Sequence, residues 1–197
     1  MRLIVATKNN SKLKEIKKIL NGIDIPIIAL ANLKKKFHII ENKPSFIENA
    51  SKKAVSVSRI YKDDYVIGED SGLEVDSLGG KPGVYSKRYS GKNSTDKKNN
   101  KKILTKLKMV STKKRGASFH CALTLAKSGK VIKCFLGVLK GRINIREQGE
   151  NGFGYDPIFY LKSYKKTVAE LTLAKKNIMS HRAKAFRKLR TYLIKNK

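Results

Sequence analysis

The chain has 197 residues, of which 40% are hydrophobic, and its formal net charge at pH 7 is +30. Apolar residues recur along the whole length, which argues against a disordered chain and predicts a single domain over residues 1–197, or two lobes that share one core. The apolar stretch at the N-terminus is too short for a signal peptide and no apolar run is long enough to span a bilayer, so a cytoplasmic protein without membrane contact is expected.

The positive charge has two interpretations. It could serve a polyanionic partner, such as a nucleic acid or a phosphate-rich small molecule. It could equally reflect lysine replacing other polar residues over the whole surface. The lysines are spread over nearly every segment, which favours the second interpretation for most of them. Cys121 and Cys134 lie in alternating apolar segments without metal-like spacing, so both are expected to be buried, reduced thiols.

The chain opens with a strand, a polar loop and a helix. "RLIVA" predicts a short buried strand, and Leu13, Ile16 and Leu20 then recur at helical spacing. Backbone N–H groups and the helix dipole at such a junction favour an anion. The loop "TKNNSK" adds neutral donors and positive charge from Thr7, Lys8, Asn9, Asn10, Ser11 and Lys12. The alternative is an ordinary helix cap with two solvated lysines.

The next elements are a strand over 23–30 and an amphipathic helix over 45–61. Ser45 and Glu48 form a capping box at the start of this helix. Further on, "STDKKNNKKILTKLK" predicts a lysine-rich helix capped by Ser94 or Thr95.

The segment "GEDSGLEVDSLGGKPG" gathers acids and glycines in an otherwise basic chain. We expect one strand over 64–70 and another over 73–78, with a sharp turn at Gly72. Asp70 would then lie at a strand end and suit a metal ligand or a general base. Glu69, its neighbour, would point to the opposite face. The alternative is a turn whose acids only keep it soluble.

The second half begins with a hairpin over 117–139. Phe119, Cys121, Leu123 and Leu125 alternate on one face, and Ser128-Gly129 supplies the turn. Together with the helices, this hairpin indicates an α/β fold with a mixed sheet.

Two later motifs carry possible chemistry. "NGFGYDP" at 151–157 places aromatic rings on a flexible loop that could stack on a base, or form a plain turn with buried rings. "SHRAKA" starts a helix capped by Ser180. His181 and Arg182 oppose the helix dipole there, which a site for an anion or a carbonyl acceptor would explain. A solvated His-Arg pair is the alternative.

Taken together, these motifs resemble the inosine triphosphate pyrophosphatase family, the dITP/XTP pyrophosphatases that clear aberrant purine nucleotides. The motifs are T-x-N-x-x-K after the first strand, "SFIENA", "DSGLEVDSLGGKPGVYSKRYSG", "NGFGYDPIF" and "SHRAKA". They occur in the family's order and with similar spacing from about Leu3 to about Leu189.

The resemblance implies an enzyme that hydrolyses dITP, ITP and XTP between the α and β phosphates, giving the monophosphate and pyrophosphate. It implies a Mg²⁺ cofactor and a homodimer. It also implies a long mixed central sheet flanked by helices, in two lobes with a substrate cleft between them.

Site residues follow from the same resemblance. Asp70 resembles the family's catalytic base, and Glu41 is similar in position to a metal ligand that would share Mg²⁺ with Asp70. The residues that resemble substrate contacts are Thr7, Lys8, Asn9, Asn10, Ser11, Lys12, Lys53, Ser71, Phe153, Gly154, Tyr155, Asp156, Lys176, His181 and Arg182. One departure is Glu69, where many relatives have a second aspartate.

Base choice would follow from hydrogen bonding. Hypoxanthine and xanthine carry a 6-oxo acceptor where adenine carries an amino donor, so a donor such as Arg182 would favour the oxo purines. Two rival functions remain: a basic nucleic-acid-binding protein that does not need Asp70, and a pyrophosphatase for pyrimidine nucleotides. We expect a purine nucleoside triphosphate as partner and no specific nucleic acid.

Overall fold

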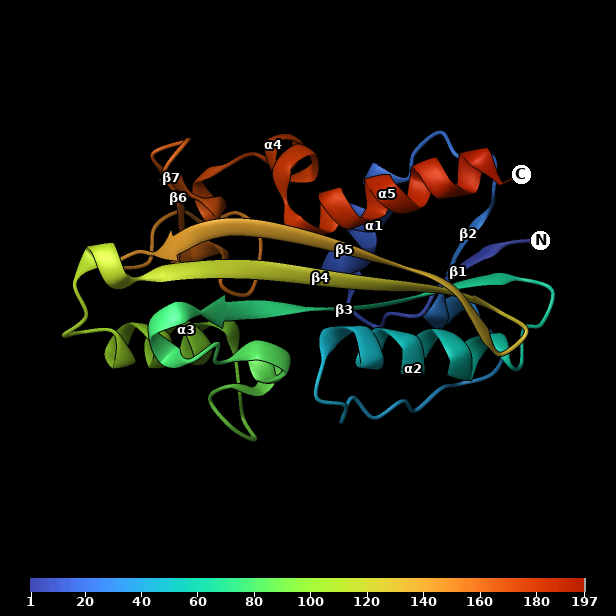
Figure 1. The fold of residues 1–197 in the computed structure, drawn as a ribbon, viewed down its shortest axis with the longest axis horizontal. Helices are drawn as coiled ribbons and strands as arrows, with labels where there is room; N and C mark the ends of the chain where they lie inside the picture. Colours follow the sequence, from blue (N-terminus) through green and yellow to red (C-terminus); the bar gives the residue numbers. More distant parts are fainter. Residues whose placement is uncertain (197) are drawn as a thin grey trace. The chain divides into compact units, whose positions relative to one another are not determined.

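The computed structural model describes residues 1–196, which build a seven-stranded mixed sheet in the order β2-β1-β3-β4-β5-β6-β7 (Figure 1). β1 pairs in parallel with β2 and β3, whereas β6 pairs antiparallel with β5 and β7. The predicted α/β class with a mixed sheet is therefore confirmed. The strands are β1 Leu3–Val5, β2 Ile27–Ala29, β3 Tyr65–Val75, β4 Gly116–Lys127, β5 Lys130–Ile143, β6 Phe159–Leu161 and β7 Lys166–Thr167.

Five α-helices accompany the sheet among the described residues, and cap residues explain where four of them begin, with Thr172 capping α4. Asn9 caps α1, Ser45 caps α2 with the predicted bond from the Glu48 amide, and Thr95 rather than Ser94 caps α3. The helices among residues 1–196 are α1 Asn10–Ile19, α2 Phe46–Ser58, α3 Asp96–Lys106, α4 Leu173–Met179 and α5 His181–Lys195. None of these helices is long and apolar enough to cross a bilayer.

β3 corrects one prediction. The expected turn at Gly72 does not exist, because β3 runs without interruption from Tyr65 to Val75, so Asp70 lies inside the strand and not at its end. Gly72 is not among the glycines with positive φ. β1 pairs with β3 at Tyr65–Ile67, and the 12-residue strand β4 is the other neighbour of the 11-residue β3, so we attribute the continued strand to its place beside β4.

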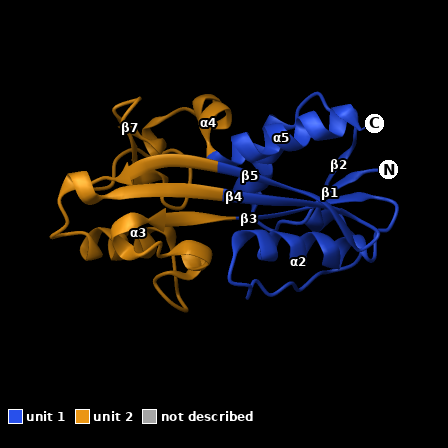
Figure 2. Ribbon diagram, viewed as in Figure 1, with its two compact units in different colours: residues 1–70, 121–137, 181–197 blue, residues 71–120, 138–180 orange. Residues whose placement is uncertain are grey.

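The chain divides into two compact units (Figure 2). Unit 1 contains residues 1–70, 121–137 and the chain from His181 onward, and unit 2 contains 71–120 and 138–180. β3, β4 and β5 contribute residues to both units. The substrate cleft expected between two lobes stays a prediction.

Unit 1 has helices on both faces of its strands: α1 and α5 on one, α2 on the other (Figure 1). A separate apolar cluster fills each side, with Phe186 of α5 in one and Ala54 of α2 in the other. α2 comes unusually close to β3, since a Cβ on Gly68 would lie 1.9 Å from the carbonyl oxygen of Ala50. This close approach brings Lys53 of α2 against the middle of β3.

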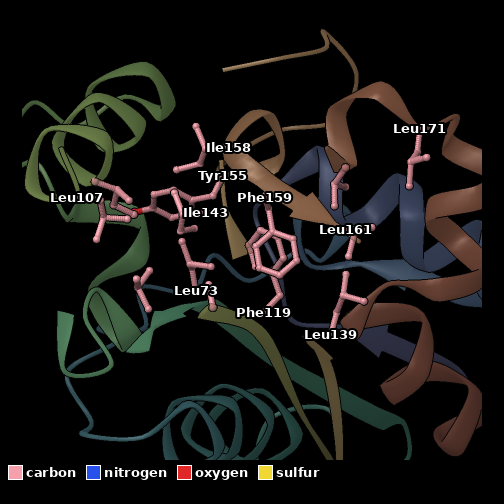
Figure 3. Packing of buried hydrophobic residues seen from close by; sticks show 14 residues of the cluster. Leu73, Leu107, Phe119, Leu139, Ile143, Tyr155, Ile158, Phe159, Leu161 and Leu171 are labelled. Atoms are coloured by element: carbon pink, nitrogen blue, oxygen red, sulfur yellow. The ribbon is translucent and has the colours of Figure 1, made fainter. Parts of the chain in front are cut away.

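Unit 2 has its own apolar core, shown in Figure 3. The rings of Phe119 and Phe159 meet there with centroids 4.3 Å apart. Tyr155 is buried in the same cluster, and its hydroxyl donates to the carbonyl oxygen of Ser86 at 2.6 Å. The loop that carries Tyr155 is therefore anchored in the core.

The β4–β5 hairpin follows the prediction, with Ser128 and Gly129 both at positive φ in its turn. The four alternating β4 residues Phe119, Cys121, Leu123 and Leu125 are all buried. Cys134, however, is exposed, so the expectation that both thiols are buried was wrong. β6 pairs with β5 only at Arg142 and Ile143, which leaves residues 130–134 at the sheet edge.

Candidate active site

The loop between β1 and α1 holds the first group of predicted residues. The side-chain oxygen of Asn9 accepts the Lys12 amide at 3.0 Å, and the Thr7 hydroxyl accepts the Asn9 amide at 3.2 Å. These two side chains thus fix the start of α1. Lys8, Asn10 and Ser11 are exposed on the same turn.

Lys53 connects two carboxylates on the α2 side of β3. Its Nζ lies 2.8 Å from Glu41 Oε2 and 3.6 Å from Asp70 Oδ1, and it donates to the backbone carbonyl of Glu69 at 2.9 Å. Lys53 and Asp70 are buried, while the side chain of Glu41 is 43% exposed. The predicted metal ligands therefore lie around one buried ammonium group.

The acidity of these two carboxylates differs. Burial raises the pKa of Asp70 to about 6, although the charges of Lys53 and Lys12 oppose the shift. For Glu41, the Lys53 ammonium outweighs the effect of burial, so its pKa lies below the usual range. A carboxylate that titrates near pH 6 can accept a proton under physiological conditions, which suits a general base.

A second charged network lies on the opposite face of β3, as alternation along the strand predicts. Glu69 Oε2 is 2.7 Å from Lys12 Nζ, and Glu69 Oε1 is 3.2 Å from Arg182 Nη2. Arg182 also pairs with Glu15 of α1 at 2.5 Å. The Cys121 thiol lies 3.6 Å from Glu69 Oε1. β3 therefore presents Glu69 to α1 and α5, and Asp70 to α2.

Charge pairing decides the protonation of this network. Burial alone would raise the pKa of Glu69, but Lys12 and Arg182 hold it far below the usual range. Burial lowers the pKa of Arg182, and the two carboxylates more than offset this, so it stays charged. Burial, helped by the Glu69 charge, raises the pKa of the Cys121 thiol. Buried charges of this kind are tolerated because each is paired.

Arg182 and His181 start α5, as predicted. Arg182 is 1% exposed and binds two carboxylates, so any contact with a purine would be additional to this pairing. His181 is buried, and a Cβ on Gly137 would lie 2.0 Å from the His181 carbonyl oxygen, so α5 begins directly against β5. Base recognition by these two residues stays a prediction.

Unit 2 brings together the predicted base-binding loop and Lys176. Asp156 Oδ2 accepts the Phe153 amide at 2.9 Å and forms an ion pair with Lys176 Nζ at 2.5 Å. The same Nζ lies 4.4 Å from the centre of the Phe153 ring. Gly152 is required here, because a Cβ would lie 2.1 Å from Asp156 Oδ2. The result is a compact loop with an aromatic ring beside a buried ion pair.

The two rings of this loop have different environments. Tyr155 is a core residue with its hydroxyl bonded to Ser86, whereas Phe153 is only half-buried. The stacking prediction therefore rests on Phe153. Ser71, also predicted to contact substrate, lies half-buried in β3 directly after Asp70.

Some residues of these clusters were not among the predicted site residues. Glu15 is buried beside Ile16 on α1. Its place next to the apolar face of the predicted helix was the one sequence feature that could have indicated a buried carboxylate. Asp96 and Asn100 of α3 contact the backbone of Gly154, which no local pattern indicated. For Glu69 the sequence predicted its orientation and a departure from the relatives but no partner, although a charged residue within an apolar strand indicates a buried partner.

Comparison with known proteins decides the family. The sequence model that describes the Ham1 family matches residues 3–192 of this chain. The chain belongs to the Ham1 family. The resemblance found in the sequence is thereby confirmed.

Ham1 relatives align over nearly the whole chain. A protein from Caldanaerobacter subterraneus named dITP/XTP pyrophosphatase is 43% identical over 195 residues, covering 99% of this chain and 97% of its own length. One of the same name from Bacillus subtilis is 44% identical over 186 residues, covering 94% and 93%. The structure of a HAM1 protein from Coxiella burnetii matches with a TM-score of 0.90 and 36% identity, covering 99% of both chains. The Staphylococcus aureus Ham1 structure matches with a TM-score of 0.89 and 37% identity over the full length of both.

Proposed function

We propose that this Ham1 protein hydrolyses the non-standard purine nucleoside triphosphates dITP, ITP and XTP to the monophosphate and pyrophosphate, and so removes them from the nucleotide pool. Its relatives bear the name dITP/XTP pyrophosphatase at 43–44% identity. The observation that carries the proposal is the buried Asp70, with its pKa raised to about 6, beside a lysine that also contacts Glu41.

In the proposed reaction, Asp70 accepts a proton from the attacking water. The water oxygen bonds to the α-phosphorus, and the bond from that phosphorus to the oxygen bridging to the β-phosphorus breaks. The electron pair leaves with pyrophosphate. Lys12 and Lys53 supply positive charge that stabilises the negative charge on the leaving group. Water and a triphosphate thus yield a monophosphate, pyrophosphate and one proton.

Mg²⁺ is part of the proposal. Within residues 1–196, no group of three or more His, Cys, Asp or Glu side chains could hold a metal by itself. Mg²⁺ usually binds through one or two carboxylates, several waters and substrate phosphates, so such a group is not required. Glu41 and Asp70 fit this pattern, because both already contact one cation, the Lys53 ammonium. When bound there, Mg²⁺ would neutralise phosphate charge.

Base recognition is assigned to the loop of Phe153 and to Lys176, His181 and Arg182. The half-buried ring of Phe153 can stack on a purine, and the N–H groups of Lys176, His181 and Arg182 can donate to a 6-oxo group. Adenine would leave a buried donor without its acceptor, which costs roughly 1–3 kcal/mol and gives about 5–150-fold discrimination.

The test is pyrophosphate release from dITP, XTP, dGTP, dATP and dUTP, with Mg²⁺ and without it. We expect dITP and XTP to be preferred and the activity to require the metal. The rate of pyrophosphate release by Asp70→Asn should be lower than that of wild type by about two or more orders of magnitude, the contribution typical of a general base. Asp63→Asn, an exposed acid in the same unit, is the matched control and should retain activity. A preference for dUTP, or tight salt-dependent binding of nucleic acid without hydrolysis, would favour the rival functions.

We further propose that the protein is a homodimer and works in the cytoplasm. The family resemblance supports the first statement. Light scattering at several protein concentrations tests the dimer: a mass near 22.2 kDa at all of them would contradict it.

A further inference from the structure

Helix α3 holds Gly154 by both of its backbone groups. Asp96 Oδ2 accepts the Gly154 amide at 2.6 Å, and Asn100 Nδ2 donates to the Gly154 carbonyl at 3.2 Å. Asp96 and Asn100 are four residues apart and therefore share one face of the helix. Gly154 follows Phe153 directly, so α3 fixes the backbone that carries this ring.

Gly154 needs such an attachment because of its conformation. Its φ is +66°, in the left-handed region, and a Cβ at this position would meet no atom within 4 Å. Open space beside Gly154 means that neighbouring atoms do not restrict this backbone position, whereas the two hydrogen bonds from α3 do restrict it. Asn100 is 2% exposed, so its bond to Gly154 is shielded from water.

The other side of the loop is attached to the same helix through Ser86. The Tyr155 hydroxyl donates to the Ser86 carbonyl at 2.6 Å, and Asn99 Nδ2 donates to the same oxygen at 3.4 Å. Asn99 also accepts the Ser90 amide at 2.8 Å. α3 thus supports Gly154 directly and Tyr155 through Ser86.

We propose that Asp96 and Asn100 are positioning residues for the purine base. They hold the backbone at Gly154 so that the Phe153 ring keeps the orientation needed to stack on the base. Because their hydrogen bonds go to the loop of Phe153, they act on base binding and base choice and leave the proton transfer at Asp70 unchanged. This inference rests on the proposed function.

The first test compares Asp96→Ala, Asp96→Asn and Thr95→Ala. Asp96→Ala removes the acceptor of the Gly154 amide, and we expect the KM for dITP to rise about 10-fold with kcat within about twofold. Asp96→Asn keeps an acceptor oxygen, so its KM for dITP should lie close to that of wild type. Thr95→Ala is the matched control, because Thr95 caps the same end of α3 and, among residues 1–196, its hydroxyl accepts only the Lys98 amide. It should weaken the helix without raising KM.

The second test separates the base from the triphosphate. Inorganic tripolyphosphate carries no base, so its inhibition constant should be the same for wild type and Asp96→Ala. The preference for dITP over dATP should fall in Asp96→Ala. Asn100→Asp, which replaces the donor by an acceptor facing the Gly154 carbonyl, should give the same pattern.

Each outcome has one meaning. If the wild type does not hydrolyse dITP, the proposed function fails. If the wild type is active and Asp96→Ala matches Thr95→Ala, the positioning role is wrong. The positioning role is also wrong if kcat falls by the same factor as KM rises. It is equally wrong if the inhibition constant of tripolyphosphate rises by that factor.

Discussion

Replacing Asp70 by asparagine is expected to stabilise the protein relative to wild type as the pH rises through about 6, while hydrolysis falls by about two or more orders of magnitude. Burial raises the pKa of Asp70 from an ordinary value of 3.8 to about 6. The folded state therefore binds a proton more tightly than the unfolded state does. Stability from this group is fully present below pH 3.8 and is lost as the pH rises through about 6. Asparagine does not titrate and escapes this loss.

The size of the effect follows from the shift. From 3.8 to about 6 is a shift of roughly two pKa units, and each unit corresponds to about 1.36 kcal/mol. Between about pH 4 and pH 8, the free energy of unfolding of Asp70→Asn should therefore rise relative to wild type by up to about 3 kcal/mol. That is a large fraction of the roughly 5–15 kcal/mol by which a domain is stable.

The assay is urea unfolding of both proteins at several pH values, with pyrophosphate release measured in parallel. Asp64→Asn is the matched control, because it is the same substitution at another buried aspartate of unit 1. Its pKa is lowered by hydrogen bonds from Arg2, 2.6 Å away, so its stabilisation is present above about pH 4 and lost on acidification. Asp64→Asn should therefore become less stable than wild type as the pH rises from below the lowered pKa of Asp64 to above its ordinary value of 3.8.

The reasoning would be refuted if the stability difference between Asp70→Asn and wild type did not change between pH 4 and pH 8. It would also fail if the difference changed in the same direction as for Asp64→Asn. A stabilised variant with normal turnover would leave the electrostatics intact and remove Asp70 from the role of base.

Two further substitutions test how the site is built. Gly68→Ala places a Cβ 1.9 Å from the Ala50 carbonyl oxygen and must displace α2. Urea unfolding should therefore show a free energy of unfolding lower by at least about 1–3 kcal/mol, together with weaker catalysis. A variant indistinguishable from wild type would contradict the close approach. Arg182→Ala leaves Glu15 and Glu69 buried without their common partner, so its free energy of unfolding should fall by about 3–5 kcal/mol. Arg2→Ala breaks an ion pair whose arginine side chain is 46% exposed and should lose much less. Equal losses for the two arginines would show that burial does not set the strength of these pairs.

Local patterns were sufficient for much of the fold. Strand β1, helices α1 and α2, and the β4–β5 hairpin follow from short-range periodicity, cap residues and one two-residue turn. The opposite orientation of Glu69 and Asp70 also follows from the sequence, because alternation in a strand is a local property. The motifs indicated the family for the same reason, since their order and spacing can be read directly from the sequence.

Tertiary contacts decided the rest. Whether Gly72 turns the chain depends on the neighbouring strand β4, which lies beside β3 in the sheet, since β3 continues through Gly72 to Val75. Whether Cys134 is buried depends on how far β6 covers β5. Arg182 pairs with Glu15 and Glu69, which are 167 and 113 positions away in the sequence. The hydrogen bond between Asp96 and Gly154 joins residues 58 positions apart. A sequence determines which side chains must find partners when they are buried, but only the folded chain determines which partners come within reach.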